Sequence, residues 1–204
     1  RQKRSPFQIE GGIQVKKKRI LAMILAVASC LSLAVSASAA NTVARKATDF
    51  RDFDKSAWYA EAVSAAVDNG LLYGKSATVI DPNGDMTRAE MAAIINRSFG
   101  CYKAADISQY KDVAKSKWYY KDVAMAVQMG TYNGRSASSM APDAPISRQE
   151  AMTVVARALE LDYDSYSKTD LSAFTDRSEI SNWAMPYVRA MVGADYIHGR
   201  GKIL

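Results

Sequence analysis

The chain has 204 residues, of which 49% are hydrophobic and 24% are charged, a composition typical of a globular protein. Its net charge of +6 comes from one end: residues 1–40 hold seven of the 27 Lys/Arg and one of the 21 Asp/Glu, which leaves 20 of each for residues 41–204. A folded region without net charge lacks the broad positive field that attracts phosphate polyanions, which argues against nucleic-acid binding.

A basic segment followed by an apolar run stands near the start of the chain. Lys16 to Arg19 are four consecutive cations, and Ile20 to Val35 is a continuous run without a charge. Ala37-Ser38-Ala39 then supplies the small residues that a signal peptidase requires. This layout predicts a secretory signal peptide over residues 15–40 and a mature chain that begins at Ala40 or Asn41.

Two alternatives to a cleaved signal stay open. A transmembrane anchor needs ~20 apolar residues, and the run is shorter than that. A lipoprotein is the other alternative because Val27-Ala28-Ser29-Cys30 resembles a lipobox, although the residues after Cys30 are apolar rather than polar. After cleavage of the signal we expect no stable membrane insertion.

Residues 1–14 precede the basic segment and lack an initiating Met, so they are interpreted as an extraneous or untranslated leader. Glu10-Gly11-Gly12 is what a ribosome-binding sequence would encode if it were translated. Val15 is then the hypothetical start residue, encoded by GTG.

From residue 41 onward the sequence repeats itself, and the first two copies match at a constant offset without a gap. A third copy begins at Phe174 and continues through Trp183 and Gly199, and Leu204 comes before its proline and its last motif. This predicts repeats over residues 41–103, 104–163 and 164–204, the third incomplete. The matched positions are Trp58 with Trp118, Gly70 with Gly130, Gly74 with Gly134, Pro82 with Pro142, and Thr87-Arg88-Ala89-Glu90 with Ser147-Arg148-Gln149-Glu150.

Each full repeat is predicted to hold two helices joined by a loop. The first helix is expected to begin near Trp58, with a buried stripe of Trp58, Ala62, Val63, Ala66 and Val67, and to end at Asn69-Gly70. Asp195 replaces the helix-ending glycine in the third copy and tolerates the left-handed conformation less well.

The second helix is expected to open with a capping box, formed by Thr87 with Glu90 and by Ser147 with Glu150. Its buried stripe should be Met91, Ile94, Ile95 and Phe99 in the first repeat and Met152, Val155 and Leu159 in the second.

The order of these signals resembles the S-layer homology repeat: a Phe-x-Asp lead, a tryptophan, a Gly-x-x-x-Gly turn, a proline and Thr-Arg-Ala-Glu. The resemblance covers about residues 47–204. It implies an all-α protein whose three tandem helix-loop-helix repeats form a pseudo-threefold helical prism, with the Thr-Arg-Ala-Glu helices at the centre. It also implies a module that anchors proteins to an anionic, often pyruvylated cell-wall polysaccharide bound in grooves between repeats.

A pyruvylated sugar offers a carboxylate and an apolar ring face, so its binder needs forked cations and aromatic surfaces. Two arginines lie in the first turn of the second helix, where N–H groups would also favour an anion. A cation follows the turn glycine in every copy. The candidate ligand-binding residues are therefore Arg88, Arg148, Lys75, Arg135, Arg200, Trp58, Trp118 and Trp183.

Structural alternatives apply to each of these residues. A tryptophan that opens an amphipathic helix is often core, and an arginine beside a capping box can serve only to pair with an acid such as Glu90. Glu90 and Glu150 are interpreted as caps rather than ligands, and the recurring turn cations can reflect common descent.

The sequence offers few residues for catalysis, disulfide formation or metal binding. His198 is the single histidine and Cys101 the single cysteine of the mature chain, so no His-based triad, internal disulfide, metal site or cofactor is predicted. Asp81-Pro82-Asn83-Gly84-Asp85 resembles the start of a calcium loop but lacks the EF-hand spacing.

The sequence thus predicts a secreted, non-catalytic wall anchor at the cell surface. The alternative is a tether for a secreted enzyme, such as a glycan hydrolase, with its catalytic domain beyond residue 204. A third hypothesis is the wall-facing end of a lattice-forming surface-layer protein, which would also self-associate.

Overall fold

The computed structural model describes residues 45–199 and 201–204, which belong to one compact unit, Arg45–Leu204. The predicted leader, the signal peptide and Arg200 lie outside the described residues. Within the described part no helix is long and apolar enough to cross a membrane.

The described residues form helices and loops without a strand, which confirms the all-α prediction. Their one isolated β-bridge joins Thr87 to Pro145. In chain order the elements are η1 (Ala47–Asp49), α2 (Ala60–Asp68), α3 (Arg88–Phe99), α4 (Tyr120–Gln128), α5 (Arg148–Ala158), η2 (Arg177–Glu179) and α6 (Met185–Gly193).

The helices α3 and α5 start where the two arginine-containing motifs stand, and both begin with the predicted capping box. Thr87 and Ser147 accept hydrogen bonds from the N–H groups of Glu90 and Glu150, and these glutamates bond back to the cap residues. Each box satisfies two otherwise unpaired N–H groups at the helix start.

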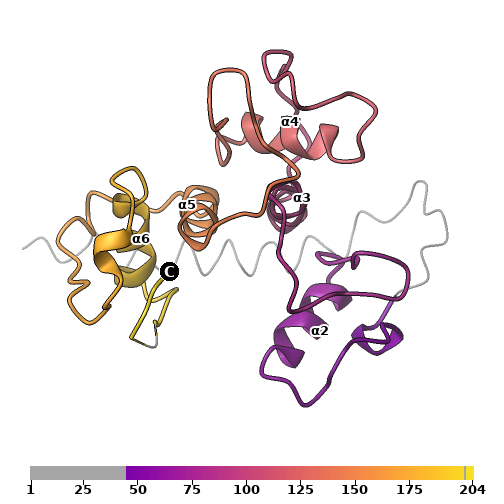
Figure 1. Cartoon of the computed structure of the whole chain (residues 1–204), viewed down its shortest axis with the longest axis horizontal. Helices are drawn as coiled ribbons and strands as arrows, with labels where there is room; N and C mark the ends of the chain where they lie inside the picture. The colour runs from indigo at the N-terminus through magenta and orange to yellow at the C-terminus, as the bar shows by residue number, and fades with distance from the viewer. Residues whose placement is uncertain (1–44, 200) are drawn as a thin grey trace, which may run out of the picture. The chain divides into compact units, whose positions relative to one another are not determined.

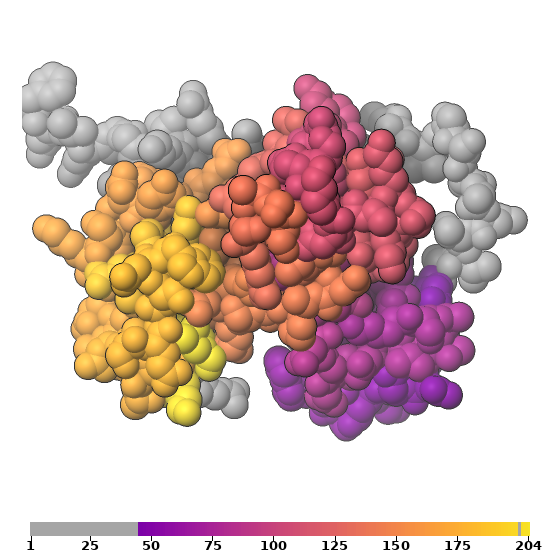
Figure 2. Space-filling view, turned by 45° about the horizontal axis from the view of Figure 1, so that its top comes forward, coloured from indigo at the N-terminus to yellow at the C-terminus, as the bar shows by residue number. Residues whose placement is uncertain are grey.

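Among the α-helices, α3 and α5 make the contacts that join the repeats. The helix α3 packs against α4 and α5, and α5 packs against α6. Figure 1 shows α3 and α5 side by side and almost end-on, with α2, α4 and α6 around them. In Figure 2 the indigo N-terminal repeat and the yellow C-terminal segment each lie against the middle repeat.

The first helix begins two residues after Trp58, and the predicted burial of Trp58 and Ala62 was wrong. Because α2 begins at Ala60, Trp58 lies before it and is 93% exposed, and Ala62 is also exposed. In the second repeat the following residue, Tyr119, is buried instead of Trp118. Phe99 was also predicted to be buried but is 42% exposed at the end of α3, next to the left-handed Gly100.

An aspartate in the lead of each repeat fastens the loop that follows the first helix. The carboxylate of Asp52 accepts the N–H groups of Ile80 and Asp81 at 3.0 and 2.7 Å. Asp112 and Asp176 make the same pair of bonds in the second and third copies, to Met140 and Ala141 and to Ile203 and Leu204. The recurrence places residues 201–204 where residues 78–81 lie in the first repeat.

These bonds also lower the pKa of all three carboxyls. For Asp52 the N–H groups of Ile80 and Asp81 are the largest influences on the pKa. For Asp112 and Asp176 burial works to raise the pKa, but the backbone N–H groups outweigh it.

The first helix of each repeat ends with a residue in the left-handed conformation. Gly70 and Gly130 have φ of +67° and +77°, as predicted, and Asp195 adopts φ of +66° at the end of α6. A non-glycine residue is strained in this region, so the third copy carries a small local cost of about 1 kcal/mol.

Candidate functional site

Two grooves lie at matching positions in the first and second repeats. The first groove, of about 560 Å³, is formed by the loop between α2 and α3, by α3 itself, and by Trp118 of the second repeat. The second groove, of about 530 Å³, is formed by residues 131–135, by α5, by Arg88, and by Trp183 of the third segment. Each groove is therefore built by one repeat and flanked by the tryptophan of the next.

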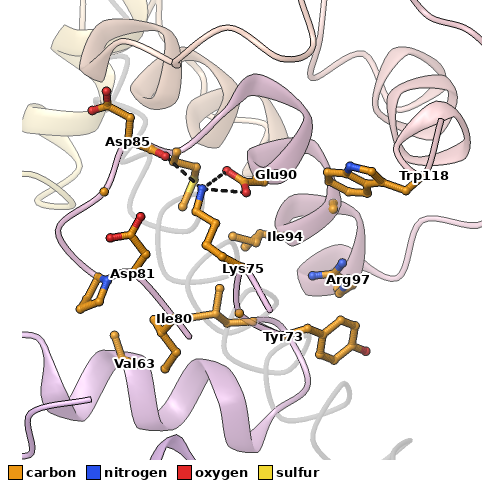
Figure 3. Close-up of a pocket in the computed structure, with 16 residues that line it drawn as sticks. Val63, Tyr73, Lys75, Ile80, Asp81, Asp85, Glu90, Ile94, Arg97 and Trp118 are labelled. Atoms are coloured by element: carbon orange, nitrogen blue, oxygen red, sulfur yellow. Dashed lines mark hydrogen bonds and ion pairs between the residues drawn. The ribbon is translucent and has the colours of Figure 1, made fainter. Parts of the chain in front are cut away.

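In the first groove a lysine bridges the loop and the start of α3. Lys75 Nζ contacts both carboxylate oxygens of Glu90 at 2.7 Å and donates to the Asp85 carbonyl at 3.0 Å (Figure 3). Burial works to raise the pKa of Glu90, but the Lys75 ammonium and the Thr87 N–H outweigh it and hold that pKa below its usual value.

In the second groove the matching glutamate has two cations. Arg88 Nη1 lies 2.8 Å from Glu150 Oε1, and Arg135 Nη2 lies 3.2 Å from the same carboxylate. Burial works to raise the pKa of Glu150, but the Ser147 N–H, Arg88 and Arg135 together lower it.

Arg88 belongs to the first repeat but is buried in the second, with 5% of its surface exposed. Its Nε donates to the Met140 carbonyl at 3.0 Å and its Nη2 to the Asn133 carbonyl at 3.2 Å. All three guanidinium nitrogens therefore have protein partners, and the side chain joins two repeats as well as lining the second groove.

The N-terminus of α3 is not free to receive an anion, in contrast to the sequence-based expectation. The N–H groups of Arg88 and Ala89 donate to the carbonyls of Ala144 and Pro142 at 3.0 and 2.9 Å. The loop of the second repeat thus occupies the N–H groups that the helix start would have offered to a ligand.

Arg148 is the counterpart of Arg88, yet it is exposed. Its Nε donates to the Ile203 carbonyl at 3.0 Å, the same bond that Arg88 makes to Met140.

The three tryptophans are exposed, so the alternative that they belong to the core is wrong. Trp58, Trp118 and Trp183 expose 93%, 61% and 52% of their surfaces. Trp118 and Trp183 flank the first and second grooves, whereas Trp58 lines neither of the two. Lys75 lines the first groove together with Trp118, and Arg135 lines the second together with Trp183. The third predicted turn cation, Arg200, lies outside the described residues.

Sequence reasoning missed one arginine in each groove. Arg97 and Arg157 lie near the ends of α3 and α5, the helices that Arg88 and Arg148 begin, and each lines its groove. Arg97 stacks on the Tyr73 ring at 4.3 Å, and Arg157 stacks on the Tyr187 ring at 4.8 Å. Their recurrence at the same offset that relates Trp58 to Trp118 was the signal that could have identified them.

The grooves combine exposed indole rings with cations, an arrangement suited to binding a polar, partly anionic ligand with an apolar face. Among the described residues no group of three or more His, Cys, Asp or Glu could hold a metal ion. Cys101 contacts the Met125 carbonyl through its sulfur at 3.5 Å, and His198 lies at the surface near Asp195.

The family model of the S-layer homology domain matches residues 49–92 and residues 109–152. This chain is an S-layer homology domain protein. The match comprises the first two repeats and includes both capping-box motifs, so the family inferred from the sequence is confirmed.

Curated relatives fall into two kinds. A surface-layer 125 kDa protein of Lysinibacillus sphaericus is 34% identical over 173 residues, which cover 84% of this chain and 14% of that protein. An endoglucanase of Bacillus sp. (strain KSM-635) is 26% identical and an exoglucanase of Acetivibrio thermocellus is 27% identical, covering 89% and 77% of this chain. The alignments span 19% and 14% of those two enzymes, so the chain corresponds to a small part of each relative.

S-layer homology domains are binding modules that attach proteins to the bacterial cell wall, and they are not themselves catalytic. The protein is accordingly a secreted, wall-associated protein of the cell surface.

Proposed function

We propose that the S-layer homology module over residues 45–204 holds the protein non-covalently on the cell wall by binding an anionic, pyruvylated wall polysaccharide. The observation that carries this proposal is the pairing, in two equivalent grooves, of an exposed tryptophan from one repeat with a turn cation from the preceding repeat.

This pairing matches the chemistry of the proposed ligand. A sugar ring presents C–H groups on one face, and these pack favourably on an indole ring. A ketal carboxylate is an acceptor for an ammonium or a guanidinium group, and a guanidinium can donate two parallel bonds to it. Trp118 with Lys75 and Trp183 with Arg135 supply one set of each kind.

The candidate residues divide into two roles in this proposal. Lys75, Arg135, Trp118 and Trp183 contact the ligand in the two grooves. Arg88 acts chiefly as a positioning residue, because its nitrogens are committed to Met140, Asn133 and Glu150. Arg148 and Trp58 lie outside the two groove linings, and Arg200 is not among the described residues. We propose that these three residues contact the polymer elsewhere along its length.

The three repeats themselves remain part of the proposal. The hydrogen bonds that the carboxylates of Asp52, Asp112 and Asp176 accept from loop N–H groups support a common loop structure in residues 41–103, 104–163 and 164–204. The packing of α3 against α5 is consistent with Thr-Arg-Ala-Glu helices at the centre of a pseudo-threefold prism.

The test is co-sedimentation of the purified protein with bacterial cell walls, before and after mild acid removes the pyruvate ketals. We expect removal of the ketals to abolish binding, and we expect Trp118→Ala with Trp183→Ala to weaken it by tenfold or more. Tyr102→Ala is the matched control, because Tyr102 is 78% exposed and lines neither groove. Walls that bind equally well with and without ketals would contradict an acidic ligand.

What the module carries is a separate question with two proposed answers. The surface-layer relative supports a lattice-forming protein that self-associates, and the two glucanase relatives support the tether of a secreted enzyme. We expect no turnover of glycans or peptides by residues 45–204, and reproducible turnover lost on mutation of a residue in this range would contradict that.

A further inference from the structure

The two grooves share a design but differ in charge. Among the described residues, the first groove is lined by two cations and three acids: Lys75, Arg97, Asp81, Asp85 and Glu90. The second is lined by three cations and one acid: Arg88, Arg135, Arg157 and Glu150. With all groups ionised these linings carry net charges of −1 and +2, a difference of three charges.

Two substitutions between the repeats and one crossing side chain explain this difference. At the positions that match Asp81 and Asp85, the second repeat has Ala141 and Pro145, which carry no charge. The third charge is Arg88, which crosses from the first repeat into the second groove.

One arginine of the second groove has no acidic partner within the part of the chain that the structure describes. Glu150 is committed to Arg88 and Arg135, whereas Arg157 donates to neutral groups, the Thr131 carbonyl at 3.5 Å and the Tyr187 hydroxyl at 3.3 Å. Both bonds are long, so a carboxylate would be a better acceptor for this guanidinium than its present partners. Tyr187 holds the guanidinium by stacking, so little entropy is lost when it binds.

In the first groove Arg97 likewise donates to a neutral group, the Leu71 carbonyl at 2.7 Å, but the net charge of the lining is reversed. Lys75 is already bound to Glu90, and Asp81 and Asp85 lie on the same side of the groove, with the backbone carbonyl of Asp85 facing Lys75 (Figure 3). An added carboxylate would meet a surface of net negative charge there. The rest of that lining is largely apolar, with Val63, Leu72, Ile80 and Ile94 beside Trp118.

Resting on the function proposed above, we propose a division of labour between the grooves. The second groove takes the carboxylate of an acidic sugar residue, with Arg157 and Arg135 as its cations. The first groove takes a neutral sugar residue of the same polymer, packed on Trp118 and the apolar wall.

The tryptophans allow each groove to be measured separately, because the chain has three of them and each groove is lined by one. Trp58→Phe with Trp118→Phe leaves Trp183 as a fluorescent reporter of the second groove. Trp58→Phe with Trp183→Phe leaves Trp118 as the reporter of the first. The probes are the methyl glycoside of a hexose with a pyruvate ketal and the methyl ester of the same compound, which has no charge.

We expect the acid to bind at Trp183 at least about tenfold more tightly than its ester, since a charge-assisted hydrogen bond is worth about that factor or more. At Trp118 the ester should bind at least as tightly as the acid. Arg157→Gln should lower the affinity of the second groove for the acid by about tenfold and leave its affinity for the ester unchanged. The matched variant Arg97→Gln should not lower the affinity of the first groove for either probe.

A gain of binding gives the sharpest check. Asp81→Asn with Asp85→Asn removes two negative charges from the first groove and keeps the backbone carbonyl that accepts from Lys75. Asparagine also tolerates the φ of +57° at position 81. This variant should bind the acid several-fold more tightly at Trp118 than the parent does.

Wall co-sedimentation separates failure of this inference from failure of the proposed function. If the protein binds walls but the acid prefers the first groove, or neither reporter responds to a probe, the division of labour is wrong and the anchoring function stands. If the protein does not bind walls, both are wrong. If Arg157→Gln fails to fold, Arg135→Gln decides the matter, because that side chain is 44% exposed and on the rim. Unchanged affinity of Arg135→Gln for the acid would then overturn the proposal.

Discussion

The loops of the first and second repeats carry the same turn glycine, the same following cation and the same capping glutamate, yet they bind their surroundings differently. In the first repeat Lys75 and Glu90 close a pair within one loop and one helix start. In the second, Glu150 also receives Arg88 from the neighbouring repeat, in a pair whose side chains are 6% and 14% exposed. The same motif thus stabilises a loop in one place and joins two repeats in the other.

This difference rests on the arginine of the Thr-Arg-Ala-Glu motif. Arg88 holds neighbouring repeats in register and fixes the wall of the second groove through its bonds to Met140, Asn133 and Glu150. Arg148 repeats the first of these bonds, since its Nε donates to the Ile203 carbonyl.

Arg88→Ala is expected to have the largest effect on stability, because it removes the side chain that joins the first two repeats. Removing one partner of a buried ion pair leaves Glu150 without its closest cation and two carbonyls without donors, so we expect a loss of about 3–5 kcal/mol in the free energy of unfolding. Chemical denaturation followed by circular dichroism would measure it.

Arg148→Ala is the matched control for that experiment, because it removes the same residue type from the same motif position. Arg148 is exposed and its Nε bonds a single carbonyl, so we expect a loss of about 1 kcal/mol. Equal losses in the two variants would show that burial of Arg88 does not distinguish the repeats.

The all-α fold, both capping boxes and the turn glycines could be predicted from the sequence because each depends on local signals at short range. The exposure of Trp58 could not, since it depends on whether the helix begins at residue 58 or 60, and helix starts are uncertain by about two residues. The burial of Arg88 could not be predicted either. It depends on the carbonyls of Met140 and Asn133, which belong to the loop of the other repeat and are distant in sequence.

The candidate site was predicted in part for the same reason. The recurrence between the first two repeats predicts the turn cations and the tryptophans, and it also contains Arg97 and Arg157, whose place in the grooves depends on the packing of α3 and α5 rather than on a local signal. The lead aspartates mark the repeat in the sequence, but their bonds to a loop about 28 residues later depend on the folded chain, in which Asp112 and its counterparts fasten the loop that forms the groove wall.

The pH dependence of stability tests the comparison of the two repeats through the capping glutamates, with a smaller expected change than Arg88→Ala. The folded-state pKa values of Glu90 and Glu150 are both lowered, so their contributions to stability are present above the unfolded pKa of about 4.3 and are lost as the pH falls through the folded values. Stability should therefore be flat between about pH 5 and 7 and should fall below about pH 4.

Replacing each glutamate by glutamine measures how much of the stability at pH 7 depends on that carboxylate. Glu150→Gln leaves two arginines without an acid and should lower the stability at pH 7 by about 2 kcal/mol, whereas Glu90→Gln releases one exposed lysine and should cost about half as much. Each variant should show a shallower loss of stability below pH 4 than the parent. A parent whose stability rises as the pH falls from 5 to 3 would contradict the lowered pKa values.

The smallest effect distinguishes the two turn cations themselves. Lys75 and Arg135 are both partly exposed, at 33% and 44% of their side-chain surfaces, so neither pair is worth more than about 1 kcal/mol. Their removal should still differ, because Lys75→Ala leaves Glu90 without the one cation it contacts among the described residues, whereas Arg135→Ala leaves Glu150 bound to Arg88. We therefore expect a loss of about 1 kcal/mol for Lys75→Ala and less than about 0.5 kcal/mol for Arg135→Ala, measured by denaturation at low ionic strength and again in high salt. High salt should reduce the stability loss of Lys75→Ala toward that of Arg135→Ala, since exposed ion pairs are screened.

In an Arg88→Ala background Arg135 becomes the cation nearest Glu150, so Arg135→Ala should then lower the stability more than it does in the parent. If the cost of Arg135→Ala is the same in both backgrounds, the two arginines do not share Glu150, and the second groove is not held together in the way the comparison requires.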